Sequence, residues 1–82
     1  MERIEVLFAS IAANSVAIIT TDCSKNGYTA IGVVGWANSG SSGFYPYELR
    51  VLSTNLHVHI RNVTSSIISN AGITIFVLYQ KN

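Results

Sequence analysis

Residues 25–38 of the chain read KNGYTAIGVVGWAN, and this stretch decides how the fold is predicted. Its Asn26-Gly27 pair is a strong turn signal because both residues tolerate positive φ. The run that follows, Tyr28 to Asn38, is rich in β-branched and aromatic residues and predicts a strand. Alternate positions of this strand are apolar on both faces, so we expect a central strand that is covered on both sides.

The segments on either side predict further short strands. They are residues 1–12 (a strand or a short helical lead-in), 16–22, 44–52, 56–61, a short piece around 66–69 within a polar stretch, and 73–79. The segment 56–61 alternates cleanly, with Leu56, Val58 and Ile60 inward and polar residues on a wet outer face. The segment 73–79 is apolar on both faces, so it should also be central.

The segment 44–52 contains the only proline, Pro46, which cannot donate a ladder hydrogen bond. This strand should therefore begin at a sheet edge. Strict alternation would place Tyr45, Tyr47, Leu49 and Val51 on one side of it. Six to seven short strands separated by turns predict an all-β fold, an antiparallel β-sandwich of jelly-roll-like form, in a single domain over residues 1–82.

Composition points to self-association. Hydrophobic residues make up 49% of the chain and charged residues 11%, and the mean hydropathy is +0.38. Ordinary soluble domains carry about 25% charged residues, so a small monomer of this composition would expose apolar patches of the kind that mark interfaces. We expect a homo-oligomer, with interface candidates at Ile31, Val33, Phe76 and Leu78.

The same numbers argue against several other partners. A net charge of +1 without a basic cluster offers no footprint for nucleic acid. No run reaches the ~20 apolar residues that a spanning helix needs, so we expect no membrane insertion. A single Cys23 rules out an internal disulfide.

Candidate catalytic and metal-binding groups are sparse. His57 and His59 at i, i+2 could present two imidazoles to a metal ion, but one chain then supplies too few ligands. In a threefold assembly with this strand near the axis, three such pairs could supply six nitrogens. We favour two histidines on a polar face. Cys23 lacks a positioned base, and the four acidic residues are scattered along the chain. We expect no catalytic residues, no enzyme activity and no cofactor. Asn62-Val63-Thr64 matches a glycosylation acceptor, which matters only in a secreted eukaryotic protein, and we set it aside.

Aromatic side chains around a loop of small residues are the better functional signal, since Tyr and Trp offer flat surfaces with a polar edge that suit saccharide or protein contacts. The ligand-binding candidates are Trp36, Asn38, Ser39, Ser41, Phe44, Tyr45 and Tyr47. Packing is the alternative role for these aromatic residues, and it is favoured for Trp36 and Tyr47.

Several motifs resemble one known family. They are Ala13-Asn14-Ser15 before a strand, Lys25-Asn26-Gly27-Tyr28, Ile31-Gly32-Val33-Val34-Gly35-Trp36, Ile60-Arg61-Asn62 and Val77-Leu78-Tyr79-Gln80-Lys81. Over residues 13–81 the chain is similar to the C-terminal β-sandwich module of tailed-phage and prophage tail-fibre or receptor-binding structural proteins. One departure is that the chain starts at Met1 without a long fibre shaft.

The resemblance implies a homotrimer at a fibre tip that binds a host-surface glycan or protein. It implies a location in the virion tail, or in the cytoplasm of the bacterium that carries the prophage. It carries over no set of ligand residues, because these motifs mark the fold. The alternative hypothesis is a free-standing, lectin-like carbohydrate-binding module of bacterial origin that works as a monomer or dimer.

Overall fold

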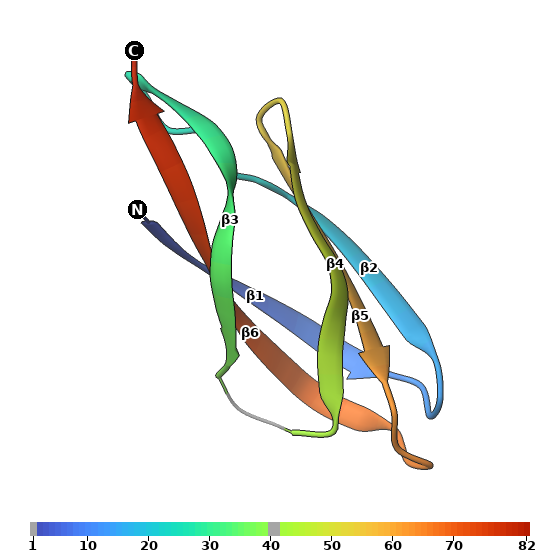
Figure 1. The fold of residues 1–82 in the computed structure, drawn as a ribbon. Coiled ribbons are helices and arrows are strands. Elements are labelled where there is room, and N and C mark those ends of the chain that lie inside the picture. Colours follow the sequence, from blue (N-terminus) through green and yellow to red (C-terminus); the bar gives the residue numbers. More distant parts are fainter. Residues whose placement is uncertain (1, 40–41) are drawn as a thin grey trace.

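The computed structural model describes residues 2–39 and 42–82, and within them it contains six β-strands and no helix (Figure 1). The strands are β1 (Glu2–Ile11), β2 (Val16–Asp22), β3 (Tyr28–Asn38), β4 (Phe44–Leu52), β5 (Asn55–Asn62) and β6 (Ile68–Lys81). The N-terminal segment is therefore a strand and not a helical lead-in. In the described part of the chain no helix is long and apolar enough to cross a membrane.

The strands form two antiparallel sheets of three strands each. Sheet A has the order β1-β6-β3, and sheet B has the order β2-β5-β4. β3 approaches β4 and β1 approaches β2 across the space between the sheets, so the molecule is a stack of two layers (Figure 1). This arrangement confirms the predicted antiparallel β-sandwich.

The core lies between the two central strands, β5 and β6. Alternate side chains of these strands point inward and have no exposed surface: Leu56, Val58, Ile60, Ile73, Ile75 and Val77. Full burial of one such side chain contributes about 1.5–3 kcal/mol, so these six supply much of the stability. The predicted alternation in residues 56–61 and the predicted central place of residues 73–79 are both confirmed.

β3 differs from the prediction, because it is an edge strand of sheet A and not a central one. Two register shifts interrupt its pairing with β6. Each shift is a bulge that changes which positions face inward. As a result, Ala30 and Val33 pack against the core, whereas Ile31 and Val34 are more than half exposed. The outer side of this apolar strand is uncovered in the single chain.

β4 lies at an edge of sheet B, as Pro46 predicts. A register shift directly after Pro46 leaves Tyr47 as the extra residue. The shift changes the phase of the strand, so Leu49 and Val51 pack against the core while Tyr45 and Tyr47 are exposed. The prediction that all four side chains share one side is wrong for this reason.

The predicted turn before β3 is present. Tyr28 N donates to Lys25 O at 3.0 Å, and Gly27 has a φ of 81°. The short strand predicted around residues 66–69 is the start of the long strand β6, which begins at Ile68. The turn explains why the chain reverses between β2 and β3 with so few residues.

Gly43 precedes β4 with a φ of 91°, a conformation that residues with a side chain rarely adopt. A Cβ atom at this position would lie 2.7 Å from Thr64 Cγ2. The neighbouring Ser42 is exposed. Glycine is therefore required at position 43 by both the backbone and the space around it.

We expect Gly43→Ala to lower the free energy of unfolding by about 1–3 kcal/mol, because it adds strain at positive φ and a close contact with Thr64. Ser42→Ala is the matched control and should change it by less than about 0.5 kcal/mol. Urea unfolding followed by Trp36 fluorescence measures both variants. Equal effects of the two substitutions would contradict the requirement for glycine.

Candidate functional site

Three connections meet at one end of the sandwich, whereas β1 begins and β6 ends at the other end (Figure 1). We call the first end the loop end; it comprises residues 12–15, the described residues 39, 42 and 43, and residues 63–67. Backbone hydrogen bonds join the connections: Asn14 N donates to Thr64 O and Val63 N donates to Gly43 O, both at 3.0 Å. Segments far apart in the sequence thus form one surface.

Asn62 holds the loop end together from inside, and it has no exposed surface. Its Nδ2 group donates to the carbonyl oxygens of Ile11 and Ala12, both at 3.1 Å, and of Ser66 at 2.8 Å. Its Oδ1 atom accepts from Thr64 N at 2.8 Å and from Thr64 Oγ1 at 2.7 Å. The amide has two hydrogens, so the three carbonyls share them. Asn62 thereby ties the end of β1 to the connection between β5 and β6.

The same contacts decide whether the motif Asn62-Val63-Thr64 can accept a glycan. Glycosylation needs an accessible amide nitrogen on a surface loop. Here the amide nitrogen is buried and donates to three carbonyls. The folded chain therefore presents no acceptor at this motif.

The outer face of sheet B carries an aromatic, a basic and an aliphatic side chain beside the loop end. The strand register aligns Tyr45 of β4, Arg61 of β5 and Val16 of β2 in one row. Tyr45 is 42% exposed and Val16 51% exposed, and Arg61 is also exposed. Among the described residues Arg61 has no ion-pair partner. The row thus combines a flat aromatic surface with an uncompensated positive charge.

The two histidines lie further along the same face, as the predicted wet side of residues 56–61 implies. The His59 ring meets the Tyr47 ring edge-on, with a centroid distance of 5.7 Å and an interplanar angle of 80°. His57 Nδ1 lies 3.4 Å from Thr20 Oγ1. Within residues 2–39 and 42–82 no three His, Cys, Asp or Glu side chains are placed to hold a metal ion. A metal at His57 and His59 would require ligands from other chains.

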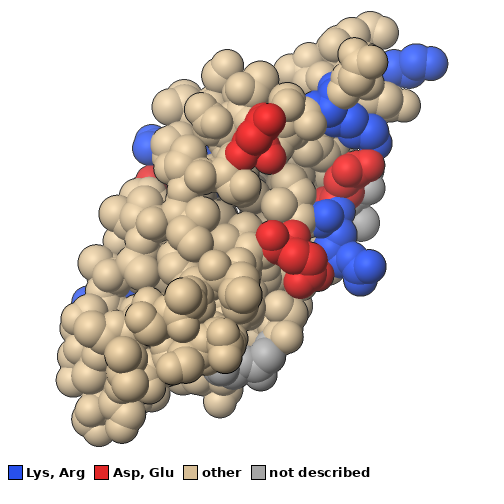
Figure 2. Space-filling view, turned by 180° about the vertical axis from the view of Figure 1, so that it is seen from behind, with Lys and Arg blue, Asp and Glu red and all other residues tan. Residues whose placement is uncertain are grey.

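Charged side chains gather toward the end that carries the start of β1 and the end of β6 (Figure 2). The residues at the loop end are largely uncharged, since residues 6–21 and 62–80 contain no Asp, Glu, Lys or Arg. Arg61, one residue before the end of β5, is the charged residue next to this end. Its charge therefore stands in otherwise neutral surroundings.

The structure divides the predicted ligand-binding residues between the two sheets. Tyr45 and Tyr47 lie on the outer face of sheet B. Trp36, Asn38 and Ser39 lie at the loop-end part of β3 and just after it, and all three are exposed. The candidates at the loop end thus come from both layers of the sandwich.

Two of the predicted ligand-binding residues, Phe44 and Ser41, are not among the exposed residues described above. Phe44 is 4% exposed and belongs to the core, because the position directly after Gly43 faces inward. This burial corrects its assignment as a ligand contact. Ser41 lies outside the described residues.

The outer face of sheet A carries most of the predicted interface residues. Ile31 is 52% exposed, Leu78 39% exposed and Phe76 partly buried. Val33 instead packs against the core, so its assignment to the interface is wrong. Val34, which is 55% exposed, takes its place because of the bulges in β3. We call Ile31, Val34, Phe76 and Leu78 the apolar strip.

Two glycines keep the apolar strip open. Gly32 pairs with Leu78 and Gly35 pairs with Phe76 in the register of β3 and β6. Because glycine has no side chain, β3 places nothing directly beside these two residues at the paired positions. A Cβ atom at Gly32 would have no neighbour within 4 Å. The backbone of β3 is therefore approachable from outside the sheet.

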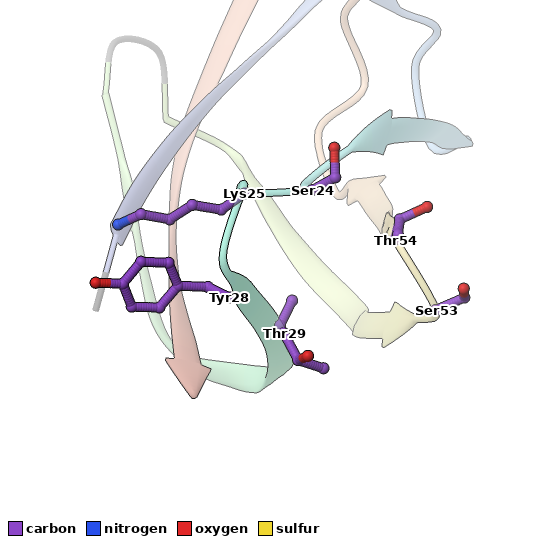
Figure 3. A pocket seen from close by; sticks show the side chains of 7 residues that line it. Ser24, Lys25, Tyr28, Thr29, Ser53 and Thr54 are labelled. Atoms are coloured by element: carbon purple, nitrogen blue, oxygen red, sulfur yellow. The ribbon is translucent and has the colours of Figure 1, made fainter. Parts of the chain in front are cut away.

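A surface pocket lies near the other end of the molecule (Figure 3). It has a volume of about 190 Å³ and is lined by Ser24, Lys25, Tyr28, Thr29, Ala30, Ser53 and Thr54. Lys25 Nζ pairs with Glu2 and lies 4.6 Å from the centroid of the Tyr28 ring. The hydrogen bond that Lys25 donates to Glu2 raises the pKa of Lys25. This ammonium is thus already engaged, and hydroxyl groups supply most of the remaining polar lining.

Cys23, beside this pocket, is held as a buried thiol. It is 2% exposed, and its Sγ atom donates to Thr54 O at 3.4 Å. Burial, followed by the charge of Asp22, raises the pKa of Cys23 above its ordinary value. The thiolate is the nucleophilic form of cysteine, so this environment disfavours nucleophilic chemistry.

Comparison of the chain with protein-family models, with curated proteins and with solved structures finds no match. The candidate sites are therefore defined by the geometry described above. The sequence alone did not assign a binding role to Arg61 or a structural role to Asn62. The available signals were the position of Arg61 at the end of the wet face and the ability of Asn to accept a hydrogen bond from the backbone two residues on.

We expect Asn62→Ala to lower the free energy of unfolding by about 2–3 kcal/mol, because it leaves buried carbonyl groups at the loop end without donors. Asn55→Ala, which removes an exposed asparagine from the same strand, is the control and should have a small effect. Urea unfolding at one protein concentration compares the two. A small loss for Asn62→Ala would show that the amide does not hold the loops together.

We expect the free energy of unfolding to fall as the pH rises above about 9. Burial is the largest cause that raises the pKa of Cys23 above its ordinary value of 9.0 and the pKa of Tyr79 above its ordinary value of 10.0. The folded chain holds these protons more tightly than the unfolded chain. The resulting stabilisation is therefore complete at a pH below the pKa values of the unfolded chain, and it is lost as the pH rises through the pKa values of the folded chain. Urea unfolding across this pH range measures the decline. Cys23→Ala should show a shallower decline, and an unchanged slope would exclude Cys23 as a cause.

Proposed function

We propose that the chain is a non-enzymatic structural module of a tailed phage or prophage, located at the tip of a tail fibre or receptor-binding protein in the virion tail. In this proposal it forms a homotrimer and contacts a host-surface glycan or protein. The observation that carries the proposal is the exposed apolar strip on sheet A. The sequence resemblance supplies the family and the threefold assembly.

The apolar strip supports self-association because it is what an interface core requires. Interface cores are depleted in charged residues, and the strip combines Ile31, Val34, Phe76 and Leu78 with two glycines that allow close approach. The edge strand β1 places two charged residues, Arg3 and Glu5, on the outer face of sheet A, and Arg3 lies opposite Phe76. The outer face of sheet B carries more charged and polar groups, since β4 and β5 place Glu48, Arg50, Arg61 and two histidines on it. We therefore assign the outer face of sheet A to the contact between copies.

The arrangement of the two ends supports a role at a tip. β1 begins and β6 ends at one end of the sandwich, and the loop end is at the other (Figure 1). A shaft joined to the module through its N-terminus would therefore leave the loop end pointing away from the shaft. The loop end carries exposed hydroxyl, amide and apolar groups, including Val63 and Ile67, which suit contact with a host surface.

The molar mass in solution tests the assembly. We expect light scattering behind a sizing column to give about three times 8.9 kDa for the chain. The double substitution Ile31→Ser with Val34→Ser should shift the mass toward 8.9 kDa without unfolding the chain, because both side chains are exposed in the monomer.

The matched control is Val16→Ser with Ile18→Ser, which removes two side chains of similar exposure from sheet B. This control should keep the mass of the unsubstituted chain. A mass near 8.9 kDa for the unsubstituted chain would overturn the trimer and favour the free-standing lectin-like module. Loss of the trimer in the control alone would move the contact to sheet B.

A further inference from the structure

We infer that the outer face of sheet B beside the loop end binds an acidic saccharide, one that carries a carboxylate or phosphate group. The residues that would form this site are Tyr45, Arg61, Tyr47 and His59, which we call the acidic-glycan face. The inference rests on the proposed function, because it names the class of glycan that the module would contact.

Arg61 supplies the charge for this recognition. Its guanidinium has no ion-pair partner among the described residues. Glu48, the acidic residue that β4 places on this face, pairs with Arg50 at 3.6 Å. A guanidinium can bind a carboxylate or phosphate through two parallel hydrogen bonds. The unpaired Arg61 beside a neutral loop end therefore favours an anionic group at this place.

Tyr45 supplies a flat surface next to that charge. It lies directly opposite Arg61 in the register of β4 and β5, and side chains in such a pair are close enough to contact one ligand. A tyrosine ring offers an apolar face with a polar edge. One sugar ring can therefore cover Tyr45 while its acidic group meets Arg61.

Tyr47 extends the same surface along β4. Its side chain lies on the same outer face as that of Tyr45, and its ring meets the His59 ring at 5.7 Å. It is 47% exposed, and it follows Tyr45 by two residues, or about 7 Å along a strand. A saccharide longer than one unit can therefore contact both tyrosines. His59 adds a ring that can form hydrogen bonds.

The position of this face is compatible with the assembly proposed above. The apolar strip lies on the outer face of sheet A, on the opposite side of the sandwich from the acidic-glycan face. Covering the strip with other copies would leave Tyr45 and Arg61 exposed. Assembly and glycan binding can therefore be tested separately.

Binding to polymers with and without acidic groups tests the inference. The probes are polygalacturonate with its methyl ester, and phosphomannan with unphosphorylated mannan, immobilised for biolayer interferometry at low salt. We expect the intact chain to bind at least one acidic polymer about tenfold or more tightly than its neutral counterpart, since hydrogen bonds between charged groups are the strong ones. The polymer that binds distinguishes a carboxylate from a phosphate ligand.

Two substitutions locate the site on the acidic-glycan face. Arg61→Gln should weaken binding to the acidic polymer about tenfold, and Tyr45→Ala should weaken binding while the circular dichroism spectrum is kept. Lys81→Gln is the control, because it lowers the net charge by the same amount at the opposite end of the molecule. Equal losses in Arg61→Gln and Lys81→Gln would indicate general charge attraction and overturn the site.

Three further outcomes would overturn the inference: no binding to either acidic polymer, equal binding to an acidic polymer and its neutral counterpart, or full binding by Arg61→Gln. The molar mass is read independently of these results. A trimer that binds no acidic polymer would leave the proposed assembly standing and remove this site. A monomer that binds through Arg61 would remove the trimer and leave the site.

Discussion

The packing of β5 against β6 is the interaction on which the rest of the structure depends. Each strand is hydrogen-bonded on both sides within its own sheet, and each turns fully buried aliphatic side chains toward the other. A chain of this length can build only one such core. The four remaining strands are all edge strands. Asn62 closes the core at the loop end, where its buried amide takes the hydrogen-bonding role that water would have at the surface.

Bulges in the edge strands determine which apolar and aromatic side chains of this weakly charged chain lie on the surface. The bulges in β3 leave Val33 inside and Val34 outside, and the bulge in β4 turns Leu49 and Val51 inward while Tyr47 stays outside. Bulges are frequent at sheet edges, where a strand has one partner and can bend away from it. The result is an apolar strip on one sheet and an aromatic, basic face on the other. We interpret the first as the contact between copies and the second as a place for a ligand.

The uneven distribution of charge separates the two ends of the sandwich. Lys25 and Glu2 pair at the end where β1 begins, whereas the loop end is largely neutral apart from the neighbouring Arg61. A charge is felt most strongly where no opposite charge is near it. Arg61 is one of several charged residues in the sequence, and its neutral surroundings beside the loop end distinguish it from the others. The separation of charge also fits a module that is held at one end and makes contacts at the other.

Local patterns in the sequence were sufficient to determine the strands, the turn at Asn26-Gly27, the edge position of Pro46 and the sandwich class, because alternation and turn chemistry depend on neighbouring residues. Tertiary structure alone decided that β3 lies at an edge, that Val34 rather than Val33 is outside, and that Phe44 is buried. It also decided that Asn62 joins two connections. These features depend on register and on contacts between distant segments, and a one-residue shift in register moves a side chain to the other face of its sheet.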